Sequence, residues 1–130
     1  MALSLTPLFK DMVRQFQTIT TDERFQQDFV AAVNKVLDQL SFAAVDTTFA
    51  HVNGYNAEIN DLESRHTYIL TRGLVVELMM SGRKHVSGAE GYPIALDAWF
   101  NAQGDFRVMN YRTDAEDDEA DIIGLGYLGD

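Results

Sequence analysis

The sequence contains no cysteine, which excludes thiol catalysis, disulfide bonds and cysteine-ligated zinc. Basic residues are few as well: 10 lysines and arginines stand against 20 aspartates and glutamates, a formal net charge of −10. Because no basic cluster exists to neutralise a row of phosphates, we expect no affinity for nucleic acid. The most apolar run, GLVVELMM, is interrupted by Glu77 and is far shorter than the roughly 20 residues that span a bilayer. With no basic-then-apolar signal layout at the N-terminus, we expect a soluble protein of the cytosol.

Hydrophobic residues make up 46% of the 130 positions, enough for a packed core in a single domain. The acidic residues are unevenly placed, with six of the 20 between positions 114 and 121. We therefore divide the chain into a helical domain over 1–112 and an acidic linker with an apolar C-terminal arm over 113–130.

The helical domain is predicted as a small bundle, and its clearest helix covers 20–40. Apolar residues recur there at steps of three and four, Thr20 with Glu23 matches a capping box, and Asp22 adds favourable charge at the N-terminus. A shorter helix is predicted over 7–17, where Pro7 suits a first helical position.

The segment 41–58, with the turn dipeptide Asn53-Gly54, is predicted as a connection. A second strong helix is predicted over 59–81, ending near Gly82. Its heptad-like apolar seam includes His66, a residue that we interpret as a hydrogen-bonded core or interface histidine. Because apolar residues lie on two sides, this helix is expected to be central, and part of its surface is expected to meet a neighbouring subunit. The residues assigned to that interface are Ile69, Val76 and Met80.

The segment after residue 91 fits two structures. As a helix that starts at Pro93, it places Trp99, Ala102 and Phe106 on one face; the form that we favour covers 93–103 and is followed by an extended segment. As strands it forms a hairpin over 92–112, which would make the fold α+β. Gly104 and the NAQGD turn chemistry weigh against an unbroken helix, and we predict a mainly α fold with the short helix.

The C-terminus, DIIGLGYLGD, has the glycine spacing of a dinucleotide-binding loop, Gly124-x-Gly126-x-x-Gly129. Such a loop works because a helix begins directly after it and holds the pyrophosphate at its N-terminus. Only Asp130 follows the last glycine, so we predict no cofactor. We predict instead an apolar arm that either folds back on its own domain or binds another protein. Its large apolar residues are Ile122, Ile123, Leu125, Tyr127 and Leu128.

No residue pattern indicates catalysis or metal binding. The three histidines do not share ligand spacing, the serines lack a nucleophile context, and the acidic run lacks the glycine and glutamate of a calcium loop. The basic stretch GRKH at 82–85 is interpreted as a helix end matched to the dipole, with contact to a phosphate or an acidic partner as the alternative. We expect no enzyme, no metal and no cofactor.

The order of elements resembles the head–tail connector (adaptor) proteins of tailed bacteriophages. The resemblance lies in the helix DERFQQDFVAAVNKVLDQL, the helix DLESRHTYILTRGLVVELMMSGR, the segment ALDAWFNAQGDF and the extended tail. It implies a virion protein of the neck, assembled in the host cytoplasm. Its subunits would form a ring, commonly dodecameric, under the portal, which extends the DNA channel and docks the next neck or tail protein. The tail would be the portal-binding arm.

A second class of function fits the acidity of the chain. A small regulatory or interaction module would present an acidic surface to a basic protein partner. The two hypotheses are distinguished by mixing the protein with portal and with basic candidate partners: a connector binds the portal, and an interaction module binds a basic partner.

Overall fold

The computed structural model describes residues 2–43 and 48–119, with side chains described as far as Met109. In that part of the chain, four helices pack into a small bundle beside a two-stranded sheet, so the predicted mainly helical fold is confirmed. No helix in the described ranges is long and apolar enough to cross a membrane. The elements, in chain order, are β1 (Leu3–Ser4), α1 (Thr6–Gln15), α2 (Glu23–Ala43), β2 (Glu58–Ile59), the 3-10 helix η1 (Ser64–His66), α3 (Thr67–Met80) and α4 (Gly91–Glu119).

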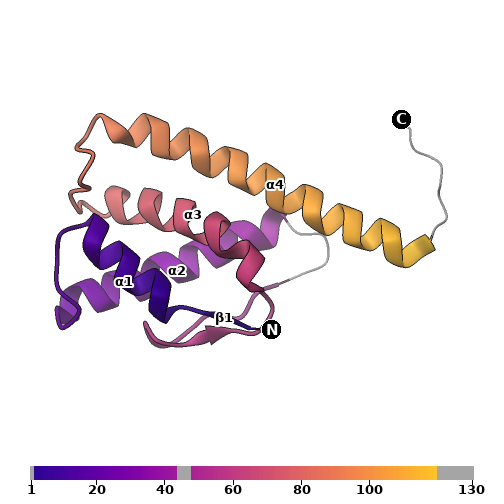
Figure 1. The fold of residues 1–130 in the computed structure, drawn as a ribbon, viewed down its shortest axis with the longest axis horizontal. Helices are drawn as coiled ribbons and strands as arrows, with labels where there is room; N and C mark the ends of the chain where they lie inside the picture. Colours follow the sequence, from indigo (N-terminus) through magenta and orange to yellow (C-terminus); the bar gives the residue numbers. More distant parts are fainter. Residues whose placement is uncertain (1, 44–47, 120–130) are drawn as a thin grey trace.

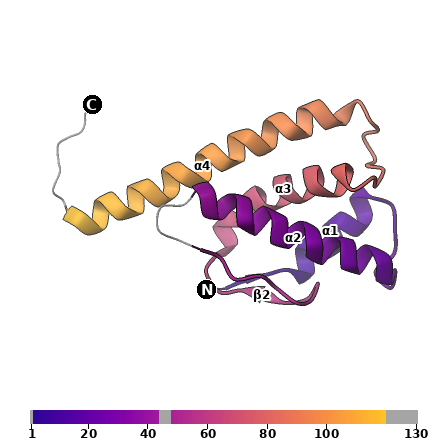
Figure 2. The same cartoon turned by 180° about the vertical axis from the view of Figure 1, so that it is seen from behind.

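Helix α3 is the central element, as its two-sided apolar pattern predicts. It packs against both α2 and α4 (Figures 1 and 2). Buried residues lie around most of its circumference, from Ile69 to Leu78. The three helices meet closely at Gly73, where an added Cβ would lie 2.9 Å from Val36 and 2.9 Å from the Trp99 ring. The missing side chain therefore lets α2 and α4 approach the same turn of α3.

Helix α1 and the small sheet close one side of the bundle. The ring of Phe9 contacts the rings of Phe25, Phe29 and Tyr55, with centroid distances between 4.5 and 5.9 Å. Strands β1 and β2 pair antiparallel, with Leu3 opposite Ile59. This aromatic cluster joins the N-terminus to α2 and to the connection before β2.

The predicted start of the third helix, at residue 59, is wrong. Ile59 lies in β2, and α3 begins only at Thr67, after the turn of η1. Glu63 and His66 form a reciprocal capping box, in which the His66 imidazole accepts a 3.0 Å hydrogen bond from the Glu63 backbone N–H. The seam residues before 67 are nevertheless buried: Ile59 from β2, Leu62 from the turn after it, and His66 from η1.

The predictions for the last segment are also corrected. The alternative hairpin over 92–112 is wrong, and so is the end of the helix at 103, because α4 runs unbroken from Gly91 to Glu119. Trp99, Ala102 and Phe106 share its buried face, and packing of this face against α3 outweighs the helix-breaking preference of Gly104. The proposed division at residue 112 therefore does not coincide with the end of an element. The last turns of α4 extend beyond the other helices (Figures 1 and 2).

The N-terminus of α2 is capped by a different residue from the one predicted. The Asp22 carboxylate accepts hydrogen bonds from the Phe25 backbone N–H at 3.1 Å and from the Thr18 hydroxyl at 2.8 Å. These hydrogen bonds lower the pKa of Asp22. The helix thus begins at Glu23, and Thr20 contributes only a backbone carbonyl, which accepts from the side chain of Gln26.

Candidate functional site

The residues predicted to form interfaces fall into three groups. The five arm residues Ile122, Ile123, Leu125, Tyr127 and Leu128 lie outside the described residues. Ile69 and Val76 are buried in the core of the chain itself, which explains their apolar character without a second subunit. Met80 is 63% exposed at the end of α3, so it alone of these three is accessible to a partner.

The outer face of α4 carries large apolar side chains that sequence reasoning missed. Ile94, Phe100 and Val108 are 73%, 60% and 53% exposed, whereas Trp99 and Phe106 on the opposite face are buried. The sequence shows that these three residues are apolar, but not which way they point. Their orientation away from the core follows only once the segment is known to be a helix and not a hairpin. These three side chains stand six and eight residues apart along α4 and are accessible to another protein.

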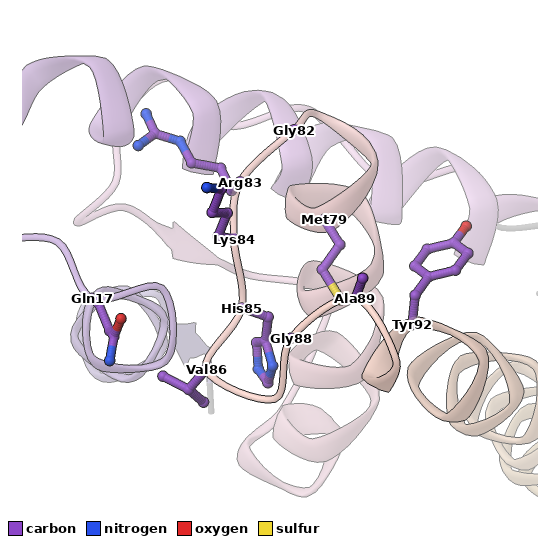
Figure 3. A pocket seen from close by; sticks show the side chains of 10 residues that line it. All are labelled: Gln17, Met79, Gly82, Arg83, Lys84, His85, Val86, Gly88, Ala89 and Tyr92. Carbon is purple, nitrogen blue, oxygen red and sulfur yellow. The ribbon is translucent and has the colours of Figure 1, made fainter.

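A cavity of about 550 Å³ lies at the end of the bundle where α1 ends and α3 connects to α4 (Figure 3). Its wall combines Gln17 after α1, Met79 in the last turn of α3, Tyr92 in the first turn of α4, and most of the loop between them. The cavity thus joins residues far apart in sequence, and no local pattern could have predicted it.

The loop that lines the cavity is anchored where it leaves α3. Gly82 has a φ of +99°, and the N–H groups of Gly82 and Arg83 donate to the Met79 and Leu78 carbonyls, a Schellman ending. The predicted role of Gly82 in ending the helix is confirmed. The Arg83 guanidinium then lies 2.8 Å from the Asp28 carboxylate and over the Phe25 ring. Arg83 therefore fixes the loop to α2.

His85 anchors the middle of the loop to α1. Its Nε2 lies 2.7 Å from Oε1 of Gln15, and its Nδ1 accepts from the Ser87 backbone N–H at 3.1 Å. This pattern requires the neutral ring with the proton on Nε2. Burial lowers the pKa of His85, which favours the same neutral form. Figure 3 shows the imidazole inside the loop. Its two ring nitrogens hold the loop against α1 through Gln15 and against the loop's own backbone at Ser87.

The cavity consequently presents a mixture of charge and apolar surface. Arg83 is paired and His85 is neutral, but Lys84 is exposed and has no ion-pair or hydrogen-bond partner in the described part of the chain. Met79, Val86 and Tyr92 supply apolar surface elsewhere on the cavity wall. Such a site suits an extended ligand that carries both negative charge and apolar groups.

Among the residues with described structure, no group of three or more histidine or acidic side chains is placed to hold a metal ion. His66 is 5% exposed with its ring against Phe106, so its predicted role as a hydrogen-bonded core histidine is confirmed. The buried Glu77 carboxylate accepts from the Gln39 side chain and belongs to the packing between helices. Comparisons with protein-family models, curated proteins and solved structures found no match to this chain.

Proposed function

We propose that this protein is a structural assembly subunit, and specifically a head–tail connector (adaptor) of a tailed bacteriophage. In this role its copies form a ring beneath the portal, extend the DNA channel and dock the next neck or tail protein. The tail residues Ile122 to Leu128 supply the portal-binding arm. The observation that carries the proposal is the exposed apolar face of α4, formed by Ile94, Phe100 and Val108.

Ring formation requires heterologous contacts, in which one patch of a subunit meets a different patch of the next. The α4 face is one such patch. A second set of exposed apolar residues is Val86, which lines the cavity, with Met80 and Ile19, which closely follow its lining residues Met79 and Gln17 in the sequence. Two unlike apolar surfaces on one small subunit favour a ring over a symmetric dimer. The acidic charge of the chain is also compatible with DNA that passes through a channel without adhering to its wall.

The proposal is tested by electron microscopy of the protein mixed with the portal of the same phage. We expect an added ring of density beneath the portal. Replacement of Phe100 by glutamate should prevent ring formation, because it places a charge in an apolar contact. Gln27→Glu on the exposed surface of α2 adds the same charge away from α4 and should leave the ring intact.

Two results would contradict the proposal. One is an unchanged ring with Phe100→Glu in a protein that retains its helical circular dichroism. The other is a stable complex with a basic partner protein and none with portal, which would favour the acidic interaction module instead. Removal of 120–130 tests the arm separately, because that truncation retains every buried residue of the described core and should lose portal docking.

A further inference from the structure

The cavity and the C-terminal segment match each other in chemistry. Residues 114–121 carry six acidic side chains, and five large apolar residues follow between 122 and 128. The cavity wall includes Lys84, which has no ion-pair or hydrogen-bond partner among the described residues, and elsewhere the apolar side chains of Met79, Val86 and Tyr92. In a chain with a net charge of −10, a locally basic surface is the place where an acidic segment binds with least repulsion.

The geometry of α4 determines which copy of the segment can bind. Tyr92, in the first turn of α4, lines the cavity, while Glu119 ends the same helix at the opposite end of the molecule (Figure 1). The 29 residues of α4 rise about 42 Å along the axis, at about 1.5 Å per residue. From Glu119 to Leu128, the last large apolar residue of the segment, nine residues span at most about 30–32 Å when fully extended. While α4 is helical, these apolar residues therefore cannot return to the cavity of their own chain.

We propose that the cavity binds the C-terminal segment, residues 114–130, of a second copy of this chain. The acidic residues face Lys84, and the apolar residues after them cover Met79, Val86 and Tyr92. The inference rests on the proposed function only in treating the chain as a self-assembling subunit. The same segment is the proposed portal-binding arm, so portal binding exchanges one partner of this segment for another.

The absence of cysteine allows a clean crosslinking test. Val86→Cys places a thiol at the cavity, where Val86 is 55% exposed, and Leu125→Cys places one in the C-terminal segment. Under oxidising conditions, an equimolar mixture of the two full-length variants should give a covalent heterodimer. The matched control pairs Leu125→Cys with Lys35→Cys, an exposed position on α2 outside the cavity, and should give little.

A single chain that carries both Val86→Cys and Leu125→Cys distinguishes binding between copies from binding within one copy. Binding between copies yields a ladder of covalent oligomers or closed rings of several copies. A closed monomer as the main product would overturn the proposal, because the segment would then reach its own cavity. Equal crosslinking of Val86→Cys and Lys35→Cys would overturn it as well.

A peptide of residues 113–130 tests the role of Lys84 directly. Titrated with the full-length protein, this labelled peptide should bind about tenfold or more weakly to Lys84→Glu, because an attraction becomes a repulsion. Lys35→Glu makes the same change of charge outside the cavity and should bind as the parent does. Equal affinities for the two variants would contradict the proposal, as would equal binding of a peptide with the same composition in scrambled order.

No portal is present in these experiments. If they fail while the portal still acquires its ring, only the docking of the segment in the cavity is refuted. If crosslinking succeeds and the portal acquires no ring, the connector function is refuted and the self-association remains.

Discussion

The indole Nε1–H of Trp99 donates a 2.8 Å hydrogen bond to Oε1 of Gln39, sixty residues earlier in the chain. The Gln39 amide nitrogen in turn donates to the Glu77 carboxylate at 2.9 Å. One glutamine on α2 thus satisfies a polar group of α4 and one of α3 inside the packed bundle. Trp99 is 2% exposed and Glu77 7% exposed, so water is a poor substitute for either contact.

Gln39→Leu should therefore destabilise the fold by about 2–4 kcal/mol, because it leaves two buried polar groups without a partner. Urea denaturation followed by circular dichroism measures the loss. Gln27→Leu makes the same chemical change on the exposed face of α2 and should stay within about 0.5 kcal/mol of the parent. Similar losses for both variants would show that the Trp99–Gln39–Glu77 network contributes nothing.

Two glycines should respond to alanine in opposite ways. At Gly73 the new Cβ would lie 2.9 Å from Val36 and from Trp99, and we expect a net loss of about 1–3 kcal/mol from overpacking. At Gly104 nothing lies within 4 Å, so Gly104→Ala should stabilise α4 by up to about 1 kcal/mol through helix propensity. Thermal denaturation of both variants checks the signs, and a stabilised Gly73→Ala would contradict the close packing of α2, α3 and α4.

Stability should fall as the pH drops below 6.5, the ordinary pKa of histidine. Burial is the main factor that lowers the pKa of His66, and the positive charge of Arg65 adds to it. Because the pKa of His66 is lower in the folded chain, the unfolded chain binds the proton more readily. The contribution of neutral His66 to folding stability is therefore fully present above pH 6.5 and is lost as the pH falls below it. His85 is shifted in the same direction and adds to the effect.

Chemical denaturation at about pH 7.5 and about pH 5.5, on either side of the histidine pKa, measures this dependence. His66→Asn retains an oxygen that accepts from the Glu63 N–H but does not titrate. It should weaken the pH dependence without abolishing it, since His85 remains. An unchanged pH dependence in His66→Asn would show that the protonation of His66 is not linked to folding.

The cap of α2 gives a prediction that distinguishes the cap seen in the structure, Asp22, from the cap predicted from the sequence, Thr20. Asp22→Ala should lower the melting temperature, because the Phe25 N–H loses its acceptor, whereas Asp22→Ser should retain most of the stability. Thr20→Ala should have little effect on the melting temperature. If Thr20→Ala proves the more harmful change, the capping box predicted from the sequence operates after all.

Helices whose stability is decided locally were predictable from the sequence. The apolar stripe that includes Phe25, Phe29 and Val33 allows only one element, and α2 lies where it was expected apart from its ends. The start of α3 was not predictable, because the pairing of Ile59 with Leu3 removes 59 from the helix and depends on a residue far away in the chain.

The same limit applies to α4 and to the candidate site. Gly104 and the turn-like NAQGD indicated a break, and only the burial of Trp99 and Phe106 against the bundle shows that the helix continues. The cavity brings Gln17, Lys84 and Tyr92 together from three segments. The GRKH stretch was visible in the sequence, but which of its cations remains unpaired depends on Asp28.

The length of α4 has a consequence for how an assembly of this protein would stop growing. If the cavity binds the C-terminal segment of a second copy, as proposed, each copy has one acceptor beside the start of α4 and one donor beyond its end. A chain of copies keeps both ends reactive at every size until they meet. A copy that lacks 120–130 should therefore terminate growth at one end, and Lys84→Glu should terminate it at the other. When a small amount of either variant is mixed with the parent protein, the ratio of variant to parent would then determine the sizes of the assemblies.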